Sequence, residues 1–73
     1  MTKEVLDELI PTLNDGDLTE LVESHLCGLY VIKNKDRDEI KKEYGLQEYV
    51  EEDSREVLIE ALYKMNEEIM KGR

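Results

Sequence analysis

The chain has 73 residues, 19 of them acidic and 10 basic, and its net charge at pH 7 is −9. A chain of this length forms one domain at most and buries only about 60% of the surface that it exposes when unfolded. Its negative charge repels nucleic acid and anionic membranes, which argues against direct binding to either. No run approaches the roughly 18 apolar residues of a membrane span, and the first residues do not have the pattern of a secretory signal. With a lone Cys as well, we expect a cytoplasmic protein with a single helical domain over residues 1–73.

The first predicted element is a short helix over residues 2–10. Its apolar residues recur at helical spacing, and Thr2 is a suitable N-cap. Pro11 lacks a backbone N–H, so the helix ends or kinks just before it. A polar turn follows, in which Asp15 or Asp17 can cap the next helix.

The second predicted element is a helix over residues 17–32. Apolar residues follow the i, i+3, i+4, i+7 pattern as far as Leu29. Beyond Gly28 the pattern weakens, and the stretch 29–32 fits either the end of the helix or a short strand. We favour helix, because no second strand-like segment exists to pair with it.

Two further helices are predicted in the C-terminal half. A short charged helix covers residues 36–44, and Gly45 is placed to end it in a Schellman motif. The last helix covers residues 53–71, is capped by Asp53 or Ser54, and is expected to be the longest. The fold class is therefore all-α: a small bundle of about four short helices with a longer C-terminal helix, near residues 2–10, 17–32, 36–44 and 53–71.

The last helix carries more apolar surface than one neighbouring helix needs. One stripe has heptad-like spacing, and a second stripe of Ile59, Tyr63 and Met70 runs beside it. Either this helix lies centrally in its own core, or it also packs on a protein partner or a second copy of the chain. The second alternative gives five candidate partner-binding residues: Leu58, Leu62, Tyr63, Met65 and Ile69.

The sequence offers little support for catalysis or metal binding. His25 and Cys27 are the only residues of their kinds, and on a helix side chains two positions apart point in nearly opposite directions. They therefore cannot act as a nucleophile and base, and two residues are too few for a structural zinc site. We expect no catalytic residue, no metal site and no cofactor.

Three short motif matches are each incomplete. The segment Asp15–Thr19 matches the D-x-D-x-T motif of haloacid-dehalogenase-type phosphatases, but their much larger α/β domain does not fit this chain. The segment Asp38–Leu46 matches the start of a helix-turn-helix, but Glu51 and Ser54 replace apolar packing residues and the acids would face phosphates. The segment Asp53–Arg55 is similar to the Asp-Ser-Leu of acyl carrier proteins, but Arg replaces Leu.

These observations predict a non-enzymatic protein-interaction module, such as a regulator, adaptor or assembly component. It would bind a protein partner through an apolar helix face, through acidic surface, or by self-association into a homo-oligomer. The candidate acidic contacts are Glu51, Glu52 and Asp53. The alternative is a DNA mimic, a kind of inhibitor often encoded by phages, which occupies the nucleic-acid site of a DNA- or RNA-binding protein.

Overall fold

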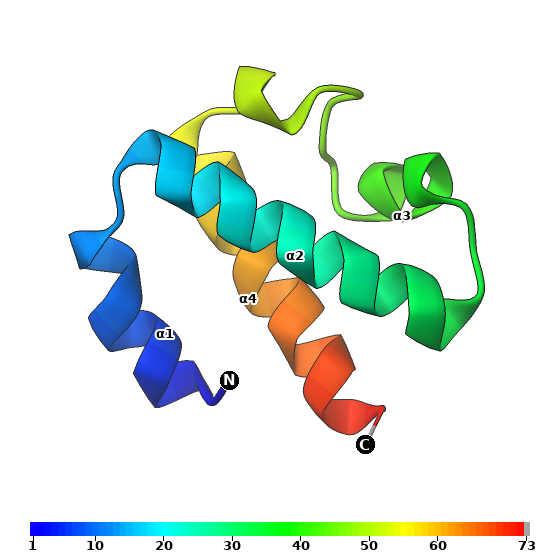
Figure 1. The fold of residues 1–73 in the computed structure, drawn as a ribbon, viewed down its shortest axis with the longest axis horizontal. Coiled ribbons are helices and arrows are strands. Elements are labelled where there is room, and N and C mark those ends of the chain that lie inside the picture. Colours follow the sequence, from blue (N-terminus) through cyan, green and yellow to red (C-terminus); the bar gives the residue numbers. More distant parts are fainter. Residues whose placement is uncertain (73) are drawn as a thin grey trace.

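A computed structural model of the chain describes residues 1–72 and contains four α-helices and two short 3₁₀ helices (Figure 1). No strand occurs in this part of the chain, so the predicted all-α class is confirmed. The stretch 29–32 lies within a helix, as the sequence favoured. The elements in chain order are α1 (Lys3–Leu9), η1 (Ile10–Thr12), α2 (Asp15–Lys33), α3 (Arg37–Glu43), η2 (Val50–Glu52) and α4 (Arg55–Lys71).

Each α-helix begins at a polar side chain that accepts a hydrogen bond from the first turn. Thr2 caps α1 as predicted, and Asp36 caps α3. Ser54, one of the two caps predicted for the last helix, caps α4. The predicted cap of the second helix is wrong: Asn14, not Asp15 or Asp17, caps α2, and its Oδ1 lies 2.8 Å from the backbone nitrogen of Asp17. Asn14 and Ser54 each have the extended backbone that an N-cap requires and directly precede the first helical residue.

The helix ends follow equally local rules. The α-helix α1 ends at Leu9, just before Pro11, and the chain continues for one turn as the 3₁₀ helix η1. At the end of α3, Gly45 adopts a φ of 71°. Its N–H donates to the carbonyl of Lys42 at 3.2 Å, and the N–H of Leu46 donates to that of Lys41 at 2.8 Å. This is the predicted Schellman motif, and it turns Leu46 back into the core.

The longest helix is α2, with 19 residues against 17 in α4. The prediction that the C-terminal helix is the longest is therefore wrong. The reason lies in the caps: Asn14 starts α2 earlier than expected, and Ser54 starts α4 later. At its other end α2 continues to Lys33 and stops at Asn34, which adopts a left-handed conformation with φ 53°.

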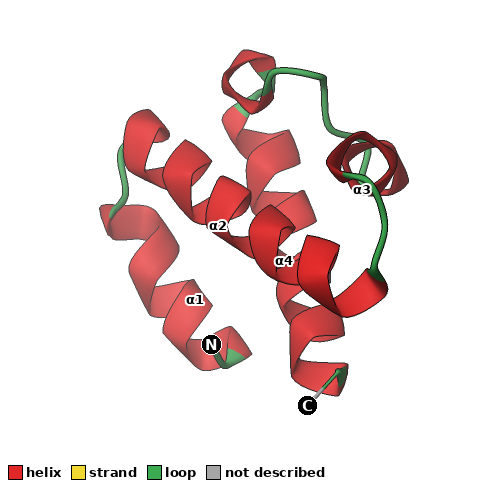
Figure 2. Cartoon of the chain, turned by 45° about the vertical axis from the view of Figure 1, so that its right-hand side comes forward, coloured by secondary structure: helices red, strands yellow, loops and turns green. Residues whose placement is uncertain are grey.

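The core forms mainly where α2 and α4 cross (Figures 1 and 2). The helix α1 lies along α4, α3 packs on the C-terminal half of α2, and η2 packs on α2. The Cα atoms span 31 × 28 × 15 Å, so the molecule is a thin slab. None of the helices described over residues 1–72 is long and apolar enough to cross a membrane. The fully buried large side chains are Leu6, Leu18, Val22, Leu26, Leu29, Ile40, Val50, Leu62 and Met65.

One side chain, that of Arg55, connects η1, the start of α2 and the start of α4. The guanidinium of Arg55, the first residue of α4, donates to the carbonyls of Ile10 at 3.0 Å and Leu13 at 2.8 Å. It also lies 3.1 Å from the Asp15 carboxylate. Arg55 therefore fixes the connection between α1 and α2 against the start of α4.

Candidate functional site

The predicted apolar anchors on α4 do not share one environment. Leu58, Leu62 and Met65 are buried in the chain's own core. They face α2, so they fulfil the first alternative for this stripe, a helix lying centrally in its own core. Because these three side chains lie in the core, a partner cannot contact them at the surface. Their predicted role in partner binding is therefore wrong, and they serve the fold.

Ile69 and Tyr63, the other two predicted anchors, lie at the margin of the core. Ile69 is half-buried, and its Cδ1 lies 3.5 Å from the position that a Cβ on Gly28 would occupy. A Cβ on Gly28 would make an ordinary van der Waals contact there, so Ile69 packs beside α2 without depending on the glycine. Tyr63 is also half-buried but points to the opposite side, toward α1, where its hydroxyl donates to Asp7.

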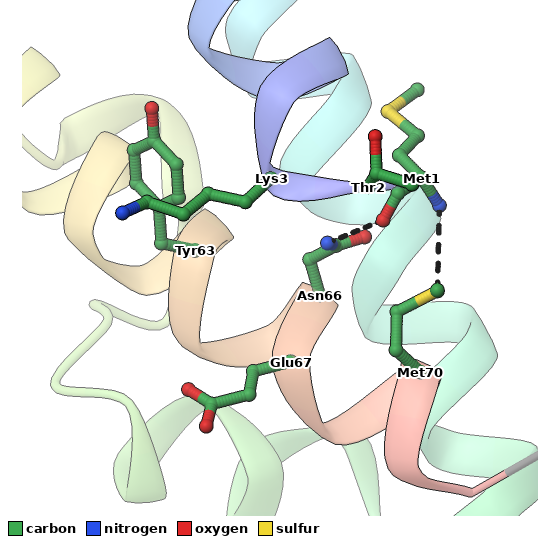
Figure 3. A pocket seen from close by; sticks show the side chains of 7 residues that line it. All are labelled: Met1, Thr2, Lys3, Tyr63, Asn66, Glu67 and Met70. Atoms are coloured by element: carbon green, nitrogen blue, oxygen red, sulfur yellow. Dashed lines mark hydrogen bonds between the residues drawn. The ribbon is translucent and has the colours of Figure 1, made fainter.

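Beside Tyr63 lies a groove of about 550 Å³ between α4 and the N-terminal segment (Figure 3). On the α4 side it is lined by residues at i, i+3, i+4 and i+7, which form one face of the helix. The opposite wall is the first three residues of the chain. We call this cleft the α4 groove; its lining is Met1, Thr2, Lys3, Tyr63, Asn66, Glu67 and Met70.

Polar contacts hold the two walls of the α4 groove together. The buried Asn66 donates through its Nδ2 to the carbonyl of Met1 at 2.6 Å (Figure 3). The Met1 ammonium lies 3.9 Å from the Met70 sulfur. Farther along, the hydrogen bond to the Asp7 carboxylate raises the pKa of Tyr63 above its ordinary value, because the bond stabilises the protonated phenol. The N-terminal segment is therefore tied to α4, while the methionine side chains remain exposed.

His25, on α2, contacts the α4 wall of the groove on the side that faces the core. Its Nδ1 lies 3.0 Å from the carbonyl of Leu21, and its Nε2 lies 3.4 Å from Oδ1 of Asn66. Both of these oxygens are acceptors, so a neutral imidazole donates to one of them, and in either case the ring lies against Asn66. Cys27 is exposed on the other side of α2, where Arg37 donates to its sulfur. The prediction that these two residues lie on different sides of a helix is confirmed.

The three predicted acidic contacts differ in their exposure and in their hydrogen bonds. Glu51 and Glu52 lie on η2 and are exposed, and neither forms a salt bridge within residues 1–72. Asp53 is half-buried and accepts a hydrogen bond from the N–H of Gln47 at 3.0 Å. Its carboxylate therefore closes the loop between α3 and η2, which is a structural role that the sequence did not indicate.

An exposed apolar group on α2 was missed by the sequence reasoning. Tyr30, Val31 and Ile32 are consecutive, helical and exposed at 49%, 76% and 47%. Continuing the helical register past Leu29 would have revealed them, because Val31 falls two positions on and points away from the core. The sequence of residues 29–32 also fits a short strand, and in a strand Val31 would share a face with Leu29.

Within residues 1–72 no three His, Cys, Asp or Glu side chains come together in an arrangement that could hold a metal ion. Comparison with protein-family models, with curated proteins and with solved structures found no match to this chain. The interpretation of the site therefore rests on its geometry.

Proposed function

We propose that the chain is a non-enzymatic protein-interaction module that binds an apolar segment of a basic protein partner in the α4 groove. The observation that carries this proposal is the groove beside the second stripe of α4. Tyr63 packs partly against the core and Met70 is exposed, and together with Met1 they line this groove of about 550 Å³. This volume lies within the range of about 300–1,000 Å³ that is typical of binding clefts.

The side chains of the groove suit a helical peptide with apolar residues on one face. Methionine is unbranched and polarisable, so Met1 and Met70 can adjust to the shape of an inserted side chain. Tyr63 supplies a rigid aromatic surface whose hydroxyl is already bonded to Asp7. Asn66 is held by Met1 and His25, so it does not need a polar partner from the ligand. The groove therefore favours apolar contacts over polar ones.

The charge of the chain favours a basic partner. The net charge of −9 creates an attractive field for a cationic protein and a repulsive one for an acidic protein. The groove itself carries the Lys3 side chain and the Met1 ammonium on one wall and Glu67 on the other. We therefore expect the partner's basic residues to lie outside the groove, flanking the apolar residues that enter it.

The buried polar groups support a binding role over a catalytic one. In the described part of the chain, His25 and Asn66 are the buried polar side chains, and they bond to each other. Both are satisfied by contacts that hold the groove wall in place, and no buried side-chain nitrogen or oxygen among residues 1–72 lacks a partner. A catalytic group typically has a polar function directed into a pocket, as general acids and bases do.

Differential capture from the native host tests this proposal. Immobilised wild-type chain is compared with Met70→Glu, which places a charge in the groove, and with Tyr49→Glu as a control at an exposed residue outside it. We expect a partner that binds the wild type and Tyr49→Glu alike but binds Met70→Glu at least about 10-fold more weakly. A partner that binds all three equally would contradict docking in the groove.

The DNA-mimic alternative is favoured by one observation: the carboxylates of Glu51 and Glu52 on η2 are exposed and form no salt bridge with another residue of the range 1–72. The same captured partner distinguishes the two proposals. Groove binding should survive Glu51→Lys with Glu52→Lys, and it should weaken only modestly between about 50 and 300 mM salt, because salt screens the attraction to the partner's flanking basic residues but not the apolar contacts in the groove. Mimicry instead requires that the double charge reversal abolish binding and that affinity fall steeply over this salt range.

A further inference from the structure

The three methionines of the chain differ in how far solvent can reach their sulfur atoms. Met65 lies in the core and is 0% exposed, whereas Met70, farther along the same helix, is 43% exposed and lines the α4 groove. Met1, on the opposite wall, is 42% exposed. An oxidant must touch a thioether in order to react with it. A peroxide in solution can therefore reach the groove methionines while the chain is folded, but it cannot reach Met65.

The Met70 side chain is the one that crosses the groove. Its sulfur lies 3.9 Å from the Met1 ammonium, and Figure 3 shows it pointing toward the N-terminal segment. In the same view the Met1 thioether extends away from this contact. On α4, Met70 stands four positions after Asn66 and seven after Tyr63, so the three share one helix face. The Met70 sulfur therefore lies between the two walls, where a docked side chain would contact it.

We propose that Met70 is a reversible oxidation site, and that a peroxide closes the α4 groove to its partner by converting this thioether to a sulfoxide. The inference rests on the proposed function, since it concerns the regulation of the same groove. In the reaction the sulfur lone pair attacks one oxygen of hydrogen peroxide, and the O–O bond breaks. The departing hydroxide takes the proton from the transferred oxygen and leaves as water. The sulfur is oxidised and the peroxide is reduced.

The reverse reaction is available to a cell. Methionine sulfoxide reductases return the sulfoxide to the thioether. Thiols supply the electrons: they are oxidised to a disulfide, and the oxygen of the sulfoxide leaves as water. Since Met70 is exposed in the folded chain, a reductase can reach it as a peroxide does.

The added oxygen opposes docking in either of the positions open to it. A thioether is a weak acceptor, whereas a sulfoxide is polar. If the oxygen points into the groove, an apolar side chain of the partner would strip water from it without supplying a donor, which is unfavourable. If it turns toward Met1, it can accept a charge-assisted hydrogen bond from the ammonium. The Met70 side chain is then tied across the groove and occupies the space that the partner needs.

A second exposed sulfur, that of Cys27, lies outside the groove. It is on the other side of α2, where it accepts a hydrogen bond from Arg37, and it does not line the cleft. Peroxide oxidises exposed thiols as well. Because the two sulfurs lie on different surfaces, substitution of each in turn separates their effects.

The first experiment needs no partner. The wild type is treated with dilute hydrogen peroxide, and peptide mass mapping follows the oxidation of each methionine with time. Met70 should react at least about 10-fold faster than Met65, and circular dichroism should show that the helices persist when Met70 is converted. Equal rates at Met65 and Met70, or loss of helix together with Met70 oxidation, would overturn a switch that acts on the folded chain.

The second experiment measures the affinity of the captured partner before and after peroxide. Oxidised wild type should bind at least about 10-fold more weakly, and a reductase with dithiothreitol should restore binding. Met70→Gln, which carries a permanent polar oxygen, should bind weakly without peroxide. Met70→Leu has no sulfur here, so its affinity after peroxide should stay within about 2-fold of its own untreated value. Cys27→Ser should respond to peroxide as the wild type does.

The outcomes separate this proposal from the proposed function. If Met70→Glu leaves capture unchanged, the groove is not the binding site and both proposals fail. If Met70→Glu weakens capture but oxidised wild type binds normally, only the oxidation switch fails. The switch also fails if peroxide weakens Met70→Leu as much as the wild type. By linkage, a saturating partner should slow the oxidation of Met70 at least about 10-fold while leaving that of Cys27 unchanged; equal protection of both would contradict docking over Met70.

Discussion

Replacing Arg55 by Met should reveal how strongly a single side chain holds this small fold together. The guanidinium donates to two backbone carbonyls, those of Ile10 and Leu13, at 3.0 and 2.8 Å. Hydrogen bonds from a charged donor contribute about 1.5–3 kcal/mol each. Since the Arg55 side chain is 37% exposed, water can partly replace it, and we take the lower end of that range. The expected loss in the free energy of unfolding is about 3 kcal/mol.

Two companion variants separate the carbonyl contacts from the ion pair. The carboxylate of Asp15 lies 3.1 Å from Arg55 but is 88% exposed, so Asp15→Asn should cost about 1 kcal/mol or less. Arg55→Lys keeps the charge but has a single ammonium in place of the planar fork. It can hold one carbonyl well and should cost about 1.5 kcal/mol.

Urea unfolding followed by circular dichroism measures these differences. A core of this size supplies about 3–5 kcal/mol of stability, so Arg55→Met should begin to unfold in little or no urea. The variants should rank Arg55→Met, then Arg55→Lys, then Asp15→Asn in order of decreasing loss. The reasoning is refuted if Arg55→Met lies within about 0.5 kcal/mol of the wild type or if Asp15→Asn is equally costly.

Three further predictions concern backbone strain and pKa values. Gly45→Ala should destabilise the fold by about 1–2 kcal/mol in the same urea assay, because the φ of 71° at this position is strained for a residue with a Cβ. The added Cβ itself has room, since nothing lies within 4 Å of it. An unchanged urea midpoint would exclude backbone strain as the role of Gly45. Ultraviolet titration of tyrosinate should show the pKa of Tyr63 above 10.0, and Asp7→Asn should lower it, whereas an identical titration in both proteins would contradict the hydrogen bond. The stabilisation from the hydrogen bond between Tyr63 and Asp7 is present at pH values below the pKa of Tyr63 in the unfolded chain. It is lost as the pH rises through the higher pKa of Tyr63 in the folded protein. The hydrogen bond from Lys35, aided by the charge of a second lysine, lowers the pKa of Glu43 below 4.5, so this carboxylate stabilises the fold above that pH and loses its effect as pH falls. Lys35→Gln should raise the pKa of Glu43 in a carboxyl NMR titration, and an unmoved value would argue against the pair.

Features that depend on neighbours in sequence were read correctly from the chain. The caps at Thr2 and Ser54 and the Schellman ending at Gly45 each involve residues within five positions of one another. The error at Asn14 is a shift among adjacent polar residues, any of which can accept the same type of hydrogen bond. Such a choice is settled by the backbone angle that the following helix imposes.

The two apolar stripes of α4 were visible in the sequence, but their roles were not. Both have helical spacing, and nothing in the spacing says which one faces α2. The structure buries Leu62 and Met65 and leaves Tyr63 and Met70 beside a groove. That outcome depends on how α1 and α2 are placed around α4, and hence on packing between distant segments.

The sequence by itself determined four α-helices, most of their limits and the acidic character of the surface, because short-range hydrogen bonds and a period of 3.6 residues fix these properties. The tertiary structure alone decided that Arg55 bonds to Ile10, 45 residues away, and that Asn66 bonds to Met1, 65 residues away. Contacts over such separations depend on the crossing of α2 and α4, which many sequences with the same helical pattern could arrange differently.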